Sequence, residues 1–152
     1  MELSGSHTFS APQQIVWRVL TDPDTLRRTL PGCQKFDPQP DGGYAVTLTI
    51  GIAVIKGSYA GSVYMLNERP PDSYTLKLSA RGAVGFVAGQ GDFILSPDAE
   101  DGQKTHLKYT GQAQVGGRVA AVGQRLLHAG ANLVIGQFFK ALDKEVARGS
   151  EV

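Results

Sequence analysis

GGRVAAVGQRLLHAGANLVIGQFFKALDKEVARG, residues 116–149, is the stretch with the longest helical pattern in the chain. Its apolar residues recur every three or four positions, as they do on one face of a helix: Val119, Val122, Leu126, Leu127, Leu133, Val134, Phe138, Leu142 and Val146. Gly116 and Gly117 open it, and Arg148 and Gly149 have the form of a basic last turn and a C-cap glycine. We therefore predict one long amphipathic helix.

Three glycines lie inside this predicted helix, at positions 123, 130 and 136. Each should cost the helix about 1 kcal/mol relative to alanine, so each needs a compensating role. Close packing against another backbone is the favoured explanation, because interior helix glycines usually have a packing reason. The alternative is that they leave space for a bound molecule.

The composition bounds the class of protein. The 152 residues predict a single domain over residues 1–152 with one sizeable core. A net charge of +1 gives no electrostatic case for nucleic acid or an anionic membrane surface. Charged residues make up 19% of the chain, below the usual share of about 25%, which hints at an extensive apolar interior with a lined cavity.

The sequence also carries expectations about location. The N-terminus has no basic segment followed by an apolar one, so no secretory signal is visible. There is no uninterrupted apolar run of the length that crosses a bilayer, about 18 residues. The single cysteine, Cys33, excludes an intrachain disulfide and suits a reducing compartment. We expect a cytoplasmic protein.

The first thirty residues predict one strand and two short helices. Residues 2–9 alternate, with Leu3, Gly5, His7 and Phe9 on one face. Ser10 and Gln13 have the spacing of a capping box, which predicts a helix to about residue 20. Asp22 and Pro23 predict the cap and first position of a second helix, which the Pro31–Gly32 pair should end.

From there to residue 115 the patterns are those of strands and turns. Strands are predicted at residues 34–37, 44–50, 54–67, 75–80, around Phe93 and Leu95, and at 106–115. Short turns between successive strands imply antiparallel pairing, and the alternation implies that one face is covered. We predict an α+β fold in which a curved antiparallel sheet of about seven strands grips the long C-terminal helix, in the order β-α-α-β6-α. Space between helix and sheet would form an apolar cavity.

A glycine-rich stretch, GAVGFVAGQG at residues 82–91, invites a nucleotide-binding interpretation. That motif requires a strand before it and a helix after it, in a parallel unit. Here both neighbours are antiparallel strands, so a flexible or bulged connection is favoured. A subordinate hypothesis is that this connection gates a cavity.

Few residues offer catalytic or metal chemistry. His7 falls on the apolar face of the first strand, where a hydrogen-bonded core histidine is favoured over a catalytic one. Cys33 has neither a base nor a clear electropositive setting nearby, so we interpret it as a buried structural residue. No H-x-x-x-H pattern, His/Cys cluster or carboxylate pair is present, and we predict neither a metal nor a cofactor.

The opening segment carries a motif formed by Gly5, Ala11–Pro12, Val16–Trp17, Asp22–Pro23, Leu26 and Pro31–Gly32–Cys33. This motif, together with others along nearly the whole chain, resembles those of CoxG, a family of carbon monoxide dehydrogenase subunits. The central segment Lys56–Gly61 resembles the family's G-x-F-x-G strand, with Tyr59 in place of Phe. The C-terminal part matches at Tyr109, Val115, Gly117, Ala120, Gly123, Arg125, Leu126, Phe138 and Phe139.

The resemblance implies a START-like, helix-grip fold of the polyketide cyclase-like (SRPBCC) superfamily. It also implies a protein that binds a quinone- or lipid-like molecule and serves a molybdenum hydroxylase of the CO dehydrogenase type. Two departures stand out. His7 replaces a residue that is commonly aromatic, and the chain stops soon after the helix, whereas some relatives carry a long membrane-anchoring extension. We therefore expect no stable membrane anchor, only transient contact at the inner membrane surface.

These observations predict a soluble, non-enzymatic carrier of an apolar small molecule, with no nucleic-acid partner. The predicted cavity residues are His7, Leu48, Ile55, Tyr59, Val63, Leu78, Phe93, Tyr109, Val122, Leu126, Leu133 and Phe138. Two alternatives stay open. One is a cyclase- or hydrolase-type enzyme that uses His7 as its acid or base, and the other is a maturation or assembly factor that binds a dehydrogenase through its surface.

Overall fold

The computed structural model of the chain describes residues 1–52 and 55–150. The elements in chain order are β1 (Glu2–Phe9), α1 (Gln13–Thr21), α2 (Pro23–Thr29), β2 (Cys33–Pro38), β3 (Tyr44–Ile50), β4 (Gly57–Arg69), β5 (Ser73–Gly82), β6 (Gly85–Pro97), β7 (Thr105–Gly116), the 3₁₀ helix η2 (Arg118–Val122) and α3 (Gln124–Ser150). This is the predicted order. The predicted start of the fourth strand, residue 54, lies outside the described residues.

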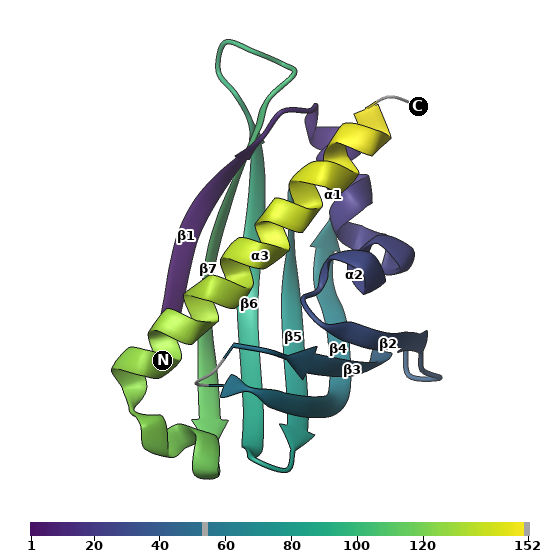
Figure 1. Cartoon of the computed structure of the whole chain (residues 1–152). Coiled ribbons are helices and arrows are strands. Elements are labelled where there is room, and N and C mark those ends of the chain that lie inside the picture. The colour runs from purple at the N-terminus through teal and green to yellow at the C-terminus, as the bar shows by residue number, and fades with distance from the viewer. Residues whose placement is uncertain (53–54, 151–152) are drawn as a thin grey trace.

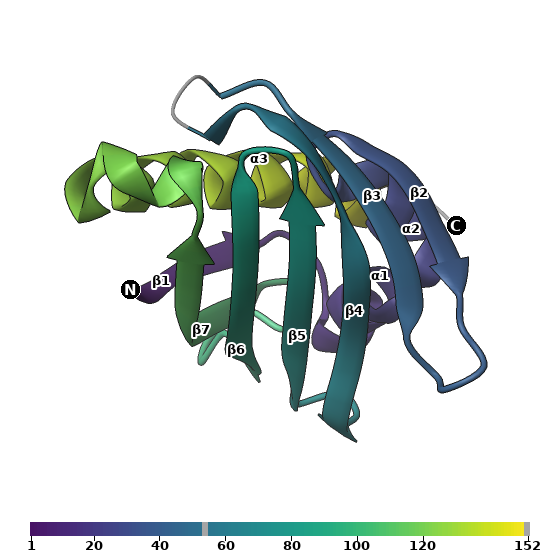
Figure 2. The same cartoon turned by 90° about the horizontal axis from the view of Figure 1, so that it is seen from below.

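The strands form one antiparallel sheet in the order β1-β7-β6-β5-β4-β3-β2 (Figure 1). Six of them follow one another as a meander, and β1 closes the edge by pairing with β7. The sheet curves, and α3 runs across its inner face while α1 and α2 fill one end (Figure 2). The predicted α+β, helix-grip arrangement is confirmed.

The main core lies under the C-terminal half of α3. Phe138, Phe139, Leu142 and Val146 pack there against buried residues of α1, α2 and the sheet, among them Phe9, Val16, Leu20, Leu95 and Leu107. A second, smaller cluster of Ile50, Tyr59 and Ala80 lies toward the other end of the sheet.

The two short helices begin by different means. Asp22 caps α2 as predicted, because its carboxylate accepts the backbone N–H of Thr25 at 3.1 Å. The predicted capping box of α1 is wrong, since α1 begins after Pro12 without a side-chain cap. The side-chain amide of Gln13 instead donates to the Pro71 carbonyl at 2.9 Å, across to the β4–β5 turn. A long-range contact here replaces the local one.

Helix α3 is shorter at its start than predicted. Residues 118–122 form the 3₁₀ helix η2, and Gly123, with φ of +94°, separates it from α3. Only glycine adopts that conformation without strain, so Gly123 is a junction residue and not an interior helix glycine. Gly149 lies within the helix, not after it, and a Cβ atom there would touch Ile15 at 3.4 Å.

The glycine-rich stretch is mainly strand. Gly82 and Gly85 pair across a tight turn, and residues 85–91 belong to β6. The predicted flexible connection over 82–91, and with it the gating loop, is therefore wrong. The stretch is a strand because β5 and β7 pair with it on both sides and supply its backbone hydrogen bonds.

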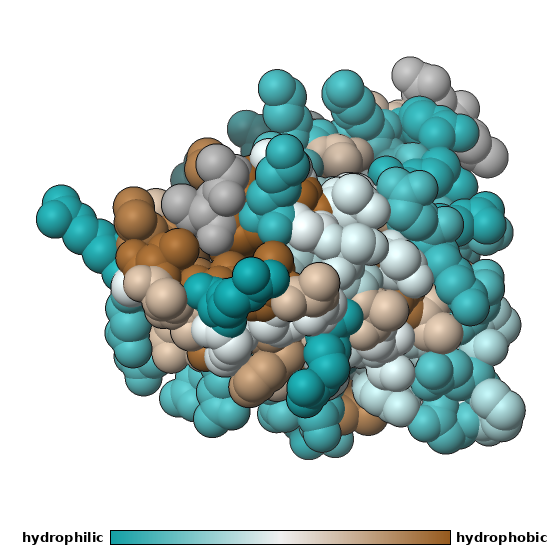
Figure 3. Space-filling model, turned by 60° about the horizontal axis from the view of Figure 1, so that its bottom comes forward, coloured by the Kyte–Doolittle hydropathy of each residue, from teal (hydrophilic) through white to brown (hydrophobic). Residues whose placement is uncertain are grey.

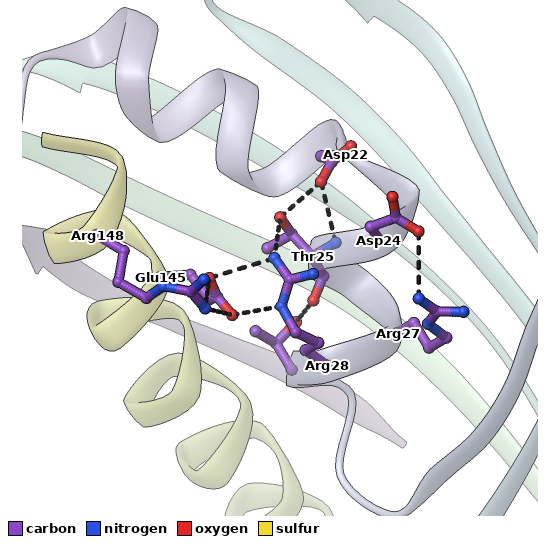
Figure 4. Close-up of polar contacts among 8 residues, drawn as sticks. Asp22, Asp24, Thr25, Arg27, Arg28, Glu145 and Arg148 are labelled. Carbon is purple, nitrogen blue, oxygen red and sulfur yellow. Dashed lines mark hydrogen bonds and ion pairs between the residues drawn. The ribbon is translucent and has the colours of Figure 1, made fainter. Parts of the chain in front are cut away.

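A charged cluster fastens the C-terminal end of α3 to α2 (Figure 4). The Nε of Arg28 donates to Oε1 of Glu145 at 2.8 Å, and Arg148 reaches the same carboxylate at 3.2 Å. The Glu145 side chain is only 11% exposed, and the hydrogen bond from Arg28 lowers its pKa below the ordinary value of 4.5. This clamp holds α3 over the filled core at the end away from the cavity.

Candidate functional site

A cavity of about 320 Å³ lies between the N-terminal half of α3 and the sheet. Strands β3 to β7 contribute most of its wall, and α3 contributes one stripe, while Leu3 of β1, Leu30 and Val119 of η2 also line it. The helix residues of this stripe are Leu127, Ala131, Val134, Ile135, Phe138 and Phe139. The cavity is therefore the space that the helix-grip prediction requires.

The cavity exists because the inner face of β6 and β7 carries small residues. Gly91 pairs with Gly111, and Gly89 pairs with Ala113, so four adjacent inward positions have almost no side chain. Gly111 must be glycine, because a Cβ atom there would stand 2.7 Å from the Gln90 carbonyl oxygen. At Gly91 a Cβ atom would have an ordinary separation of 3.5 Å, so its absence leaves space without a packing need.

The cavity wall is almost entirely apolar. Among the described residues that line it, none carries a charged side chain. The Tyr59 hydroxyl is occupied, since it donates to the Ile55 carbonyl at 2.8 Å. The Tyr109 hydroxyl makes no hydrogen bond within the described part of the chain, and burial raises the pKa of both phenols. Tyr109 is thus a lining residue whose hydroxyl is free to bind a ligand.

The structure brings seven of the twelve predicted cavity residues together around this space: Leu48, Ile55, Tyr59, Leu78, Phe93, Tyr109 and Phe138. The other five lie elsewhere. Val63 is buried in the main core, His7 lies beside a second pocket, and Val122, Leu126 and Leu133 are 37%, 50% and 57% exposed. That the seven residues bind a ligand stays a prediction.

The misplaced helix residues follow from the break at Gly123. The sequence offers two candidate stripes one residue apart, through Leu126 and Leu133 or through Leu127 and Val134. Once the helix begins at Gln124, the second stripe faces the sheet and the first faces outward. Gly89, Gly91 and Ala131 were missed because small residues mark a cavity only when their neighbours across the sheet are known.

His7 has a partner that the sequence did not suggest. Its Nε2 atom lies 2.7 Å from Oδ1 of Asp143, which is 136 positions away in α3. Its ring stacks on Phe139 with centroids 4.9 Å apart. Because His7 does not line the main cavity, the hypothesis that it acts there as an acid or base loses its geometric support.

Exposed apolar residues cluster at the end of the molecule where α3 begins (Figure 3). Val122 and Leu126 belong to this surface, and Leu133 continues it one heptad further along α3. The cavity reaches the same end, where Val119 and Phe86 line it. An apolar surface and the apolar cavity therefore lie on either side of the same helix.

Cys33 and the acidic groups do not form a reactive centre. Cys33 is half-buried and packs against the core, its thiol donates to the Lys35 carbonyl, and burial raises its pKa. Within residues 1–52 and 55–150, no group of three or more His, Cys, Asp or Glu residues has a metal-binding arrangement. No helix in the same part of the chain is both apolar enough and long enough to cross a bilayer.

Comparison with known families settles the relationship. CoxG, a family described as a carbon monoxide dehydrogenase subunit, matches residues 5–147. The chain belongs to the CoxG family. The match covers β1 through most of α3, so the CoxG family assignment rests on every element that builds the cavity.

Solved structures agree with the CoxG assignment. A conserved protein from Geobacillus kaustophilus is 36% identical with a TM-score of 0.92, and the alignment covers 97% of this chain and 96% of that one. A protein from Chromobacterium violaceum is 18% identical with a TM-score of 0.64, covering 95% and 96%. A protein from Mycobacterium smegmatis is 18% identical with a TM-score of 0.69, covering 97% and 91%. The last two show the fold alone, and no curated protein matches.

Proposed function

We propose that the chain binds an apolar small molecule, quinone- or lipid-like, in the cavity beneath α3. The supporting observation is a wall without charged side chains around a space that Gly91 leaves open without a packing requirement. Burying apolar ligand surface there contributes about 25 cal/mol per Å². The Tyr109 hydroxyl is the group that recognises a ligand oxygen.

Two tryptophan substitutions on the same helix test this proposal. Ala131→Trp places a large ring inside the cavity, whereas Leu126→Trp places it on the exposed face. We expect decylubiquinone to bind the native chain in calorimetric titration, Leu126→Trp to bind it equally, and Ala131→Trp to bind it at least tenfold more weakly. Equal binding by both variants, or no binding by the native chain, would contradict the proposal. Native mass spectra of freshly purified protein should show a co-purified apolar molecule.

We also propose association with a CO dehydrogenase-type molybdenum hydroxylase. Support comes from the family's description as a carbon monoxide dehydrogenase subunit. The carrier and maturation roles both require such contact. Co-purification of a molybdenum hydroxylase with the tagged chain from its own cells is the test, and a tagged chain that retains none of it would contradict this association.

Loading of the carrier is proposed to occur at an anionic membrane surface. The exposed residues Val122, Leu126 and Leu133 supply apolar contact beside the cavity. Arg118 and Arg125 are exposed in the same segment and supply positive charge. Partly inserted apolar side chains combined with basic ones are the features of a reversible interfacial contact.

A further inference from the structure

A second pocket, also of about 320 Å³, lies beside the main cavity, between β1, β7 and the middle of α3. Its polar lining residues are Ser6, His7, Tyr109, Asn132, Lys140 and Asp143. Tyr109, Ile135 and Phe139 line both spaces, so the two spaces adjoin at these three side chains. An apolar space and a polar one thus meet at the free Tyr109 hydroxyl.

His7 is held in one orientation at this pocket. Phe139 stacks against its ring face with an interplanar angle of 7°, and Phe9 meets the ring edge-on at 4.6 Å. Asp143, one helical turn after Phe139, fixes the ring within its plane through the 2.7 Å contact to Nε2. The His7 side chain is 25% exposed. This ring is more constrained than that of a surface ion pair, which moves freely in solvent.

The contact with Asp143 determines what His7 offers a ligand. An ionised carboxylate only accepts hydrogen bonds, so Nε2 carries the hydrogen. In the neutral ring Nδ1 then keeps its lone pair and accepts a proton or a hydrogen bond. The remaining charged group of the pocket is Lys140, which has no ion-pair or hydrogen-bond partner among the described residues. An acceptor and a cation therefore border the same space.

Gly136 leaves this pocket open at the surface of α3. It lies in the interior of α3 and lines this pocket, and a Cβ atom there would meet nothing within 4 Å. Its backbone is helical and does not require glycine. Glycine there lowers helix stability by about 1 kcal/mol relative to alanine, and no close packing compensates for this loss. Close packing does not explain Gly136, because the position is exposed and a Cβ atom there would contact nothing.

We propose that the second pocket binds the hydroxyl-bearing ring of a phenol or hydroquinone whose apolar tail lies in the main cavity. The hydroxyl donates to Nδ1 of His7, and proton transfer breaks the O–H bond and forms an N–H bond there. Lys140 and the Tyr109 hydroxyl face the resulting phenolate oxygen. His7 is the binding residue and Asp143 the positioning residue. This inference rests on the proposed function of the main cavity.

A matched pair of probes separates the two pockets. Octylbenzene carries only an apolar tail and ring, whereas 4-octyl-2-nitrophenol adds a hydroxyl whose ionisation is visible in its absorption spectrum. We expect the native chain to bind the nitrophenol about tenfold more tightly, as for a hydrogen bond with a charged partner. We also expect the bound nitrophenol to ionise about one pH unit lower than in water, a tenfold shift in equilibrium.

Three variants assign the effect to named residues. His7→Phe keeps the stacked ring but removes Nδ1, so both the tenfold preference and the spectral shift should disappear while octylbenzene affinity is unchanged. Asp143→Asn should keep most of the affinity but lose the spectral shift, because the amide no longer fixes the tautomer. Gly136→Leu fills the open space and should abolish the preference. Gln137→Leu, on the exposed adjacent position, is its matched control and should change neither the preference for the nitrophenol nor the spectral shift.

The outcomes are distinguishable. If octylbenzene binds and the nitrophenol binds no more tightly, or if His7→Phe and Gly136→Leu retain the preference, the second pocket is not the site and the cavity proposal stands. If neither probe binds the native chain, both proposals are overturned. The proposal is supported when the preference and the spectral shift are present in the native chain and are lost together in His7→Phe.

Discussion

Single glycines decide where this molecule is filled and where it is hollow. Strand alternation predicted only Gly111 on an inward position, because Gly89 and Gly91 lie in the stretch predicted as a flexible connection. Their effect depends on register, because Gly91 lies opposite Gly111 and next to Leu76 on β5. A sequence pattern reports which face a residue occupies, but not which small residues meet across two strands. The cavity itself was therefore predictable only in general terms.

Alanine substitutions separate glycines that leave space from glycines that pack. Gly136→Ala should raise the free energy of unfolding by about 1 kcal/mol, since the site is helical and open. Gly149→Ala should raise the free energy of unfolding by less, because its Cβ atom would stand 3.4 Å from Ile15 and 3.6 Å from Val19. Urea denaturation of the two variants measures the difference. A destabilised Gly136→Ala would show that this position needs glycine for its backbone.

At the scale of elements, the type and order of every main helix and strand were predictable, whereas the rotation of α3 was not. Adjacent leucines at 126 and 127 give two helical stripes of similar strength. Gly123, with its positive φ, ends η2 and interrupts the helical pattern, and α3 is packed with Leu127 toward the interior and Leu126 outward. Likewise, the side-chain amide of Gln13 donates to the Pro71 carbonyl and does not form the predicted local capping box. This contact could not be predicted because it depends on the tertiary structure.

The clamp between α2 and α3 should make stability depend on pH. The Arg28 hydrogen bond lowers the pKa of Glu145 in the folded chain. Its stabilisation is therefore complete above the ordinary carboxyl pKa of 4.5 and is lost as the pH falls below that value. Glu145→Gln should cost about 1 to 2 kcal/mol at pH 7 and less near pH 3.5. Thermal unfolding at both pH values measures this.

A second ion pair on α2 provides the control for the clamp. Arg27 and Asp24 lie 3.4 Å apart, with side chains 52% and 72% exposed. Such an exposed ion pair contributes little to the free energy of unfolding, so Asp24→Asn should leave stability nearly unchanged at both pH values. If Glu145→Gln behaved like Asp24→Asn, the junction of α2 and α3 would rest on apolar packing alone.

At the scale of the whole molecule, the balanced net charge of +1 conceals an uneven distribution. No Asp or Glu occurs between Asp101 and Asp143. The sheet topology also brings the start of β4 and the β5–β6 turn to the end where α3 begins, and there Lys56, Arg81, Arg118 and Arg125 are exposed. Glu2 reaches the same end on the outer face of β1. The net charge alone gave no indication of binding to an anionic surface, because it sums the charges at both ends of the molecule.

This distribution places the proposed membrane contact at one end of the molecule. Leu126→Ser combined with Leu133→Ser removes apolar contact beside the cavity, whereas Leu66→Ser combined with Ile94→Ser removes exposed apolar residues from β4 and β6. We expect the native chain to float with vesicles of phosphatidylcholine and phosphatidylglycerol, and less so as salt increases. The α3 pair should weaken binding about tenfold and the strand pair hardly at all. Equal losses in both pairs would show that general surface apolarity, and not the α3 end, drives the contact.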